Sequence, residues 1–394
     1  MKEGWEYKKL GEVCDFEGGS QPPKSEWINH PQEGFVRMLQ IRDFTQSRSF
    51  EIEYVKNTKK IRLCKADDIL IGRYGASVGK ILTGLAGAYN VAIIKSIPDE
   101  KVIAKSYIRR YFESSLFQNI LFKVCASRAA QAGFSKDDIC DALIPVPPLS
   151  EQQSIVDYLD SAFAKIDAMK ANAEKRLNEA QALYQASLKE MLEPKEGWEE
   201  KTLLALTSKI GSGATPKGGR KVYIDEGCHL IRSMNVQYNE FKYEDLAHIT
   251  DEAAEQLKGV EIQENDVLFN ITGASIARCC VVPTDALPAR VNQHVSILRL
   301  KQDVLPRFLS YILNSPKHQR ELLEIGEAGS TRQALTKTDL ENHVICYPNI
   351  DSQTKLLYTL DSLKSKVDKL QENYEKISQE CDALKQAILR QVFE

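Results

Sequence analysis

Two long stretches of the chain carry a helical pattern of apolar residues that no glycine or proline interrupts. The first covers 149–192 and the second 350–394. In the second stretch apolar residues recur in heptads, which is typical of a coiled-coil seam. Ser150-Glu-Gln-Gln153 has the pattern of a capping box and predicts where the first helix begins. We therefore predict two long helices over these stretches.

Two positions of each heptad form the seam predicted for the second helix. In the first helix the register breaks at Arg176 and resumes on a shifted face at Leu177, which is the pattern of a stutter. The residues predicted to pair the two helices are Ile155, Leu159, Ile166, Met169, Leu356, Leu360, Leu363, Val367, Leu370, Tyr374, Ile377, Leu384 and Ile388.

Shorter and more mixed patterns precede each helix, over 1–148 and 193–349. The apolar runs 68–72 and 89–95 predict strands, and the glycine- and proline-rich segment 18–23 predicts a loop. Each region is therefore predicted to be an α+β globule. Helical periodicity appears once in each region, over 106–124 and 305–325.

The two halves of the chain repeat each other. Residues 3–10 resemble 196–203, and Gly75-Ala-Ser77 resembles Gly273-Ala-Ser275. Further matches keep the same order along both halves, as expected of a duplicated unit. We infer two copies of one unit of about 190–200 residues. The diverged stretches between the matches are where the copies differ in their tasks.

Connectivity predicts how the two helices pair. Only 193–196 separate the first helix from the second globule, so this globule must follow at the far end of that helix. The second helix can pair with the first only by running back, which predicts an antiparallel, pseudo-twofold arrangement. Each helix would be about 65 Å long. The predicted fold class is therefore α+β, with two repeated globular domains, here called head 1 (1–148) and head 2 (193–349), separated by a long antiparallel two-helix coiled coil.

Composition excludes several classes of protein. Of 394 residues, 43% are apolar and 27% charged, which is typical of globular chains. No apolar run approaches the roughly 20 residues that span a bilayer, and no secretory signal is evident, so we expect a cytoplasmic protein without membrane contact. The nine cysteines contain no C-x-x-C pair and the six histidines no metal-ligand spacing. We therefore expect neither a disulfide framework nor a metal site.

Charge gives a divided indication about nucleic acid. Residues 1–149 carry 22 Lys and Arg against 18 Asp and Glu, whereas 193–350 carry 18 against 22. A strong non-specific DNA binder is normally basic, so charge alone leaves DNA binding open. Two similar heads related by a pseudo-dyad nevertheless suit duplex DNA with two half-sites.

Motifs that resemble catalytic ones are better explained as turns. Gly75-Ala-Ser-Val-Gly-Lys80 has too few residues between its glycines for a phosphate-binding loop, and Ile81 stands where Ser or Thr is needed. Pro98-Asp-Glu-Lys101 compresses a nuclease motif into four residues, although Mg²⁺ needs separated acidic groups. Gln21-Pro-Pro-Lys24 lacks the Asn or Asp and the aromatic residue of an adenine methyltransferase. These motifs therefore argue against a self-sufficient methyltransferase.

Taken in order, the repeated motifs resemble the specificity subunit of type I restriction-modification enzymes along essentially the whole chain. They are Gly4-Trp-Glu6 and Gly197-Trp-Glu199, the Gly/Pro loops, the Gly-Ala-Ser segments, and the junction from Phe134 to Ile155. The second junction departs from the pattern, because Cys346 to Leu356 keeps one proline and lacks the glutamate.

The resemblance implies a non-catalytic subunit for phage defence and DNA methylation. Each head would be a target recognition domain, and the helices would act as a spacer. Double-stranded DNA would be read as two half-sites with a fixed gap. The partners would be two modification (methyltransferase) subunits that use S-adenosylmethionine, and restriction/translocase subunits that use ATP and Mg²⁺; this chain itself would bind no cofactor.

Two other classes stay open on the residues alone. The chain could be a stand-alone DNA methyltransferase or nuclease, or a coiled-coil scaffold without sequence specificity. For DNA contact we select cationic, amide and aromatic residues on predicted loops and strand ends, because these groups bind base edges or phosphates. They are Arg37, Arg42, Arg48, Arg73, Tyr74, Lys80 and Arg128 in head 1, and Arg232, Asn235, Arg278, Arg290, Asn292, Arg320 and Arg332 in head 2.

Overall fold

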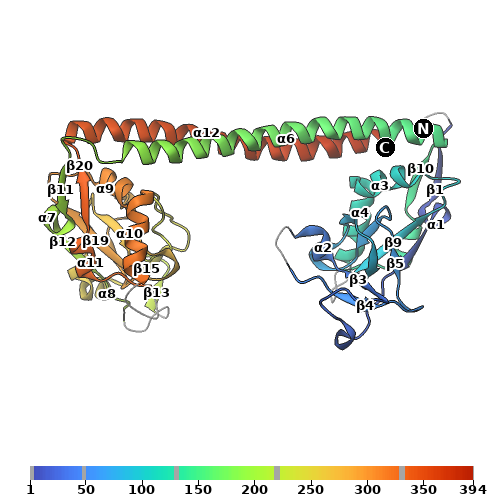
Figure 1. The fold of residues 1–394 in the computed structure, drawn as a ribbon, viewed down its shortest axis with the longest axis horizontal. Helices are drawn as coiled ribbons and strands as arrows, with labels where there is room; N and C mark the ends of the chain where they lie inside the picture. Colours follow the sequence, from blue (N-terminus) through green and yellow to red (C-terminus); the bar gives the residue numbers. More distant parts are fainter. Residues whose placement is uncertain (1–3, 47–49, 128–132, 217–221, 328–332, 394) are drawn as a thin grey trace. The chain divides into compact units, whose positions relative to one another are not determined.

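The computed structural model describes residues 4–46, 50–127, 133–216, 222–327 and 333–393 (Figure 1). The chain forms two compact units, one of Met1–Glu174 with Asn373–Glu394 and the other of Lys175–Glu372. Each unit therefore contains one head and a segment of both long helices.

Head 1 contains short strands and helices in an α+β arrangement, as predicted. Its elements are β1 (Glu6–Lys9), α1 (Leu10–Val13), β2 (Cys14–Gly18), β3 (Phe35–Leu39), α2 (Ile41–Thr45), β4 (Tyr54–Lys56), β5 (Leu63–Cys64), β6 (Leu70–Gly72), β7 (Ile81–Leu82), β8 (Gly87–Tyr89), β9 (Ile93–Pro98), α3 (Lys105–Glu113), α4 (Ser115–Ala126), α5 (Asp137–Cys140) and β10 (Leu143–Val146), followed by α6 (Leu149–Met191).

Head 2 repeats this order with small changes. Its elements are β11 (Glu199–Thr202), α7 (Leu203–Leu206), β12 (Thr207–Ser212), β13 (Tyr223–Ile224), β14 (Cys228–Ile231), β15 (Ala247–Ile249), α8 (Asp251–Gln256), β16 (Val267–Asn270), β17 (Cys279–Val281), β18 (Ala289–Val291), β19 (Val295–Leu300), α9 (Pro306–Leu313), α10 (Pro316–Glu327), α11 (Lys337–Asn342) and β20 (Val344–Tyr347), followed by α12 (Ile350–Phe393).

The sheets of the two heads confirm the duplication. Strand order β2-β9-β6-β7 in head 1 corresponds to β12-β19-β16-β17 in head 2. A second sheet in each head contains a parallel pair, β3 with β8 and β14 with β18. The heads differ at the edges of these second sheets, where the order is β4-β3-β8-β5 in one and β13-β15-β14-β18 in the other.

Strand periodicity places the central sheet of each head between two apolar layers. In head 1, Ile71 and Ile94 belong to the core formed with α3, α4 and α6, whereas Leu70 and Ile93 belong to a smaller cluster on the other face. Side chains of successive strand residues point to opposite faces, so adjacent residues serve different cores. Head 2 repeats the pattern, with Phe269 in one core and its neighbour Leu268 in the other.

Three segments predicted from the sequence are each interrupted, so their boundaries were wrong. The strand predicted over 89–95 is broken after Tyr89, and the chain turns at Asn90 before β9 begins at Ile93. The helix predicted over 106–124 is divided at Ser114, whose backbone is extended. In head 2, the helix predicted over 305–325 is likewise divided ahead of Pro316, which cannot continue a preceding helix.

In the first unit, α6 and α12 pair antiparallel. Lys170 bridges Asp382 at 3.3 Å and Asp167 bridges Lys385 at 2.5 Å, so the two helices run in opposite directions. Cys381 contacts the carbonyl oxygen of Ile166 at 3.8 Å. The end of α12 then joins the core of head 1, where Leu389, Val392 and Phe393 are buried.

In the second unit, the other segments of the same helices pack against head 2. Leu188, Met191 and Leu192 share a core with Leu357 and Leu360. Tyr184 is 8% exposed and hydrogen-bonds to Tyr311 of α9. No helix among the described residues has both the length and the apolar character needed to cross a membrane.

The prediction that residues recurring every seven positions form the seam is only partly correct. Leu159, Ile166 and Leu360 are buried, but Met169, Leu370 and Leu384 are 61%, 38% and 48% exposed. An α-helix has 3.6 residues per turn, so a seven-residue line drifts by about 20° per heptad away from one face. The remaining predicted seam residues are half-buried: Ile155, Leu356, Leu363, Val367, Tyr374, Ile377 and Ile388.

A buried glutamine joins each long helix to its head. Gln152 is 0% exposed, accepts a hydrogen bond from Ala104 N at 2.7 Å, and donates to Val102 O and Pro147 O at 3.0 and 2.8 Å. α6 begins at Leu149, so Ser150 lies inside the helix and the capping-box prediction was wrong.

The equivalent residue in the second copy is Gln353, also 0% exposed. It accepts from Leu305 N at 2.8 Å and donates to Asp303 O and Pro348 O at 3.1 and 2.8 Å. The two junctions differ beside this residue, because Trp5 donates to Glu151 at 2.9 Å in the first. The second has serine at the position of that glutamate.

We predict that Gln152→Leu lowers the free energy of unfolding by about 3 kcal/mol, because it leaves one buried amide and two carbonyl groups without partners. Urea unfolding of the full chain measures this change. The adjacent Gln153→Leu is the matched control, because Gln153 is exposed and its loss should change stability by less than about 0.5 kcal/mol. Equal effects of the two variants would contradict a structural role for Gln152.

Candidate nucleic-acid interface

Three loops meet in head 1: the glycine-rich loop after β2, the turn between β8 and β9, and the loop after β6. Gly19 lies so close to the turn that a Cβ atom on it would be 2.0 Å from the carbonyl oxygen of Asn90. A larger residue would push the loop away from the turn. The Asn90 side chain accepts from Ala92 N at 3.2 Å and holds the turn itself. The third loop joins through Arg73 N, which donates to Ala92 O at 2.8 Å.

Head 2 builds the same junction from equivalent residues. A Cβ atom on Gly213 would be 1.6 Å from the carbonyl oxygen of Val291. The Asn292 side chain accepts from His294 N at 3.0 Å, and Ile271 N donates to His294 O at 3.0 Å. We call this shared arrangement of three loops the loop junction.

The side chains around the loop junction differ between the heads. In head 1, Arg73 donates through Nε to Phe134 O at 3.1 Å, and its guanidinium lies 5.1 Å from the ring centre of Tyr74. Tyr74 is 38% exposed. The junction of head 1 therefore presents a cationic and aromatic surface.

In head 2, Ile271 and Thr272 stand at the positions of Arg73 and Tyr74, and side chains that can form hydrogen bonds surround the junction. Thr272 Oγ1 and His294 Nδ1 are hydrogen-bonded at 2.6 Å, and His294 Nε2 lies 3.1 Å from Gln293 Nε2. Thr215 bonds to the other end of the Gln293 amide. Sequence reasoning missed these four residues. Aligning Asn90-Val-Ala92 with Asn292-Gln-His294 would have found two of them.

The other candidates of head 1 are spread over its surface. Arg37 and Arg42 lie together at β3 and α2, where they bridge Asp43 at 2.7 Å and Glu53 at 2.6 Å. Their charge is therefore partly compensated. Lys80 is exposed after the Gly-Ala-Ser turn. Arg48 and Arg128 lie outside the described residues.

In head 2, two candidate arginines lie over tyrosine rings. The Arg232 guanidinium is 5.7 Å from the ring centre of Tyr223, and that of Arg278 is 5.2 Å from Tyr238. Arg320 is exposed on α10. Arg332 lies outside the described residues.

Three candidates of head 2 are corrected to structural residues because their side chains are buried. Asn235 is 0% exposed and binds three backbone groups of its own loop. Arg290 is 7% exposed and donates to the carbonyl oxygens of Ala254 and Ala289, both at 3.0 Å. Asn292, also 7% exposed, holds the turn described above.

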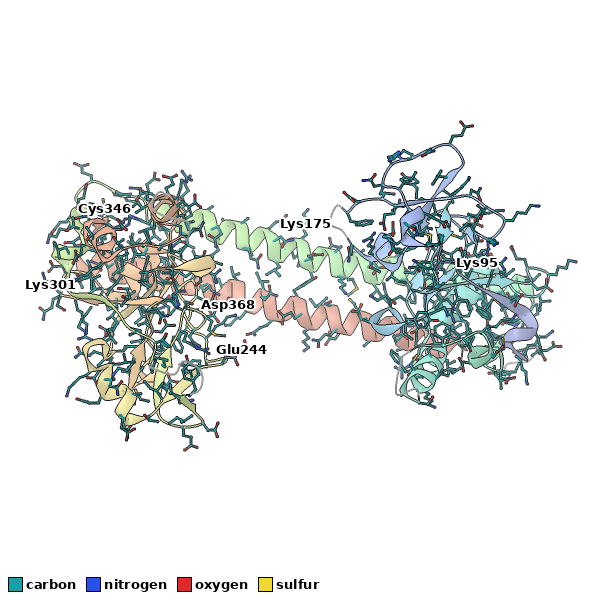
Figure 2. All side chains as sticks on the ribbon, turned by 90° about the horizontal axis from the view of Figure 1, so that it is seen from below. Lys95, Lys175, Glu244, Lys301, Cys346 and Asp368 are labelled. Carbon is teal, nitrogen blue, oxygen red and sulfur yellow. The ribbon has the colours of Figure 1, made fainter. Side chains whose placement is uncertain are left out.

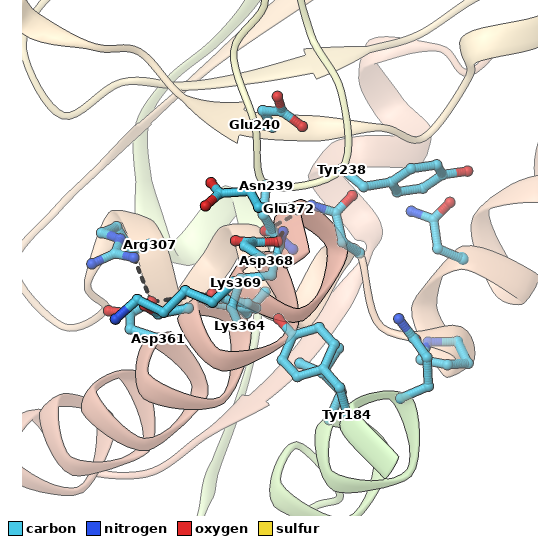
Figure 3. Close-up of a pocket in the computed structure, with 17 residues that line it drawn as sticks. Tyr184, Tyr238, Asn239, Glu240, Arg307, Asp361, Lys364, Asp368, Lys369 and Glu372 are labelled. Atoms are coloured by element: carbon cyan, nitrogen blue, oxygen red, sulfur yellow. Dashed lines mark hydrogen bonds and ion pairs between the residues drawn. The ribbon is translucent and has the colours of Figure 1, made fainter. Parts of the chain in front are cut away.

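A cleft of about 1330 Å³ lies within the second unit, between the helix segments and head 2 (Figure 3). Arg307 binds Asp361 at 2.5 Å, and Tyr311 donates to the same carboxylate at 3.1 Å. Lys364 pairs with Asp368 along α12. Charges of both signs line the cleft, whereas small-molecule sites are mainly apolar, so this surface better fits contact with a polar macromolecule.

Among the described residues, one group of possible metal ligands was also missed: His318, Glu321 and His343, whose ligand atoms all lie within 4.8 Å of one another. His343 is 25 residues from His318, so no short spacing could reveal the group. It belongs to α10 and the segment before β20, not to the loop junction.

Comparisons with known proteins agree with this architecture. The type I restriction modification DNA specificity domain matches residues 2–179 and again residues 195–379. The type I restriction enzyme EcoBI specificity subunit of Escherichia coli is 24% identical over 425 aligned positions, covering 100% of this chain and 86% of the relative.

Two solved chains have a similar fold. One, reported as "Structural basis underlying complex assembly and conformational transition of the type I R-M system", is 18% identical with a TM-score of 0.77, covering 100% of this chain and 98% of that one. The HsdS subunit from Thermoanaerobacter tengcongensis is 17% identical with a TM-score of 0.56, covering 100% and 97%. With the domain matched in both halves, the chain belongs to the type I restriction modification DNA specificity family and is a non-catalytic DNA sequence-specificity subunit.

Proposed function

We propose that this subunit reads a bipartite DNA target, with one half-site recognised at the loop junction of each head. The observation that carries the proposal is that both heads build the loop junction in the same way but place different side chains around it. Gly19 and Asn90 in one head correspond to Gly213 and Asn292 in the other. A constant frame with variable polar groups is suited to binding the same kind of ligand with different sequence preference.

The chemistry of the junction residues fits base recognition. Arginine can bind guanine with two hydrogen bonds, and glutamine can bind adenine in the same way. Arg73 and Tyr74 supply cationic and aromatic groups in head 1, and Thr272, Gln293 and His294 supply hydrogen-bonding groups in head 2. The two heads therefore favour different half-sites.

The long helices act as the spacer and as a docking surface for two modification subunits. α6 has 43 residues and α12 has 44, and in each unit their segments pack on the adjoining head. Large apolar side chains remain exposed on these helices, among them Tyr158, Leu183 and Tyr358, at 55%, 64% and 79%. Exposed apolar surface of this kind supports a protein-binding role.

The partner subunits supply the chemistry. Modification subunits use S-adenosylmethionine to methylate an adenine that is extruded from the duplex at each half-site, and restriction/translocase subunits use ATP and Mg²⁺. The complex acts on DNA in the cytoplasm. What supports this assignment is the family match over both halves of the chain.

We predict that the double variant Gln293→Ala/His294→Ala relaxes recognition of one half-site only, because both residues lie at the loop junction of head 2. Each lost base contact should cost about 1–3 kcal/mol of discrimination. Mapping of methylated adenines by the complex with its modification subunits measures this change. Tyr74→Ala should affect the other half-site. Loss at both half-sites from either variant would contradict the assignment of one head to one half-site.

Gly213→Ala should weaken recognition of the head 2 half-site at least about tenfold, because its new methyl group would overlap Val291 O and displace the loop. Gly211→Ala is the matched control, since nothing lies within 4 Å of a Cβ atom there. DNA-binding titrations with each half-site mutated in turn distinguish the two. Equal DNA affinities of the two variants would show that the loop junction does not position the residues that contact DNA.

Insertion of one heptad into both helices, after Glu174 and after Glu372, should lengthen the recognised gap while leaving both half-sites unchanged. Seven residues add about 10 Å, which equals roughly three base pairs of duplex at 3.4 Å each. Methylated-site mapping reads the gap directly. An unchanged gap would contradict the spacer. Methylation of all sequences alike would favour a scaffold, and methylation by the purified chain alone would favour a stand-alone methyltransferase.

A further inference from the structure

Two buried histidines and a glutamate lie together in the second unit. His318 Nδ1 and His343 Nε2 are 2.9 Å apart, and His318 Nδ1 is 3.6 Å from a carboxylate oxygen of Glu321. Both histidines are 6% exposed. His318 and Glu321 lie on the first turns of α10, and His343 precedes β20. The group therefore connects a helix to the strand segment that leads into α12.

Comparison with head 1 shows that these polar residues replace apolar ones. Gln118 and Gln319 make matching bonds to the loops that contain Gly79 and Ala277, so His318 corresponds to Phe117. Phe117 is 0% exposed and packs on aromatic neighbours.

The other two members correspond to apolar residues as well. Leu10 N donates to Ala142 O in head 1, and Leu203 N donates to His343 O in head 2, so His343 corresponds to Ala142. The register of the helix places Ile120 at the position of Glu321. Three contacting positions thus changed together from apolar residues to ligand-forming ones. Buried polar groups need partners, and the bond between the rings involves one nitrogen of each imidazole, the same two atoms that a metal ion would take.

We propose that His318 Nδ1, His343 Nε2 and the Glu321 carboxylate bind one divalent transition-metal ion, Zn²⁺ by preference. Two imidazoles with one carboxylate are a common ligand set for zinc, which leaves a further position for water. Zinc–nitrogen bonds of about 2.05 Å in tetrahedral geometry place two ligand nitrogens about 3.3 Å apart. The observed 2.9 Å needs only a small outward movement of one ring.

The surroundings allow an ion to enter. A cleft of about 400 Å³ is lined by His318 and Glu321 together with the loop around Pro194. Burial lowers the pKa of both imidazoles, to about 3 for His318 and about 4 for His343, so both are neutral ligands at pH 7. When an ion binds, the proton in the hydrogen bond between the rings moves to the other nitrogen of the ring that carries it. Metal binding therefore releases no proton.

The charges facing the site are of both signs. Lys317 lies close enough to disfavour a positive charge on either histidine, so it also opposes a cation. Glu321 offsets this repulsion. Cys346 (Figure 2) interacts with Lys317, Glu321 and Glu200, so further anionic and sulfur groups are near. The bound ion would join α10 to the segment that leads into β20 and α12.

The test is metal binding by the full-length chain after treatment with a chelator. Equilibrium dialysis with Zn²⁺ should show one ion per chain, and Co²⁺ should give the visible absorption of a tetrahedral nitrogen–oxygen site. Saturating Zn²⁺ should raise the Tm by about 5 °C. An absence of bound Zn²⁺ or Co²⁺ at one equivalent would overturn the proposal, leaving a histidine pair that shares a proton.

Variants identify the ligands. His318→Phe/His343→Ala installs the residues of head 1 and should reduce Zn²⁺ affinity at least about 100-fold. Glu321→Gln, which preserves shape, should reduce it as a second, independent variant. Lys317→Leu should increase affinity, because it removes a repelling charge.

His229 and His248 provide the matched control, because their rings are also close, with centres 4.9 Å apart, but lie on β14 and β15. His229→Ala/His248→Ala should leave the bound ion in place. Metal binding that is lost in this control but kept in His318→Phe/His343→Ala would overturn the assignment.

Discussion

The buried amide at the start of each long helix is the interaction on which the rest of each unit depends. Gln152 and Gln353 each bind one backbone amide and two carbonyl groups in the head, and each is 0% exposed. Three directional bonds fix the end of a helix more tightly than apolar contacts, because hydrogen bonds constrain angle as well as distance. Since one bond returns to a proline carbonyl just before the helix, the same side chain also fixes where the helix begins. Such a rigid attachment suits the spacer role that we propose for the helices.

Much of this architecture was available from sequence because the chain is duplicated. The repeated Gly-Trp-Glu and Gly-Ala-Ser segments predicted the two heads, and the uninterrupted apolar pattern predicted α6 and α12. The breaks within shorter elements were not predictable, because the Asn90 and Ser114 side chains make local bonds, to Ala92 N and Tyr111 O, that asparagine and serine can make in many contexts. The exposed Leu370 and Leu384 show a different limit. Residues that recur every seven positions lie along one row on the helix surface. Whether this row keeps facing the partner helix depends on supercoiling.

The candidate interface was harder to predict for a related reason. Asn235 and Asn292 are chemically suited to reading adenine, yet burial commits them to backbone groups. Residue type alone cannot distinguish an amide that holds a loop from one that reads a base. The junction residues Thr272 and His294 gave no sequence signal by themselves, because only the fold brings their loops together.

The repeat itself separates these two roles. Asn90 and Asn292 make the same bond in both heads, so they belong to the frame. Arg73 and Ile271 occupy equivalent backbone positions, and only their side chains differ.

The divergence of side chains around a shared loop junction also reconciles the net negative charge of head 2 with DNA binding. If recognition depends on hydrogen bonds at three converging loops, then the charge of the remaining surface mainly sets the salt dependence and non-specific affinity. Weak non-specific attraction then raises the ratio of specific to non-specific binding, which is the quantity a specificity subunit must maximise.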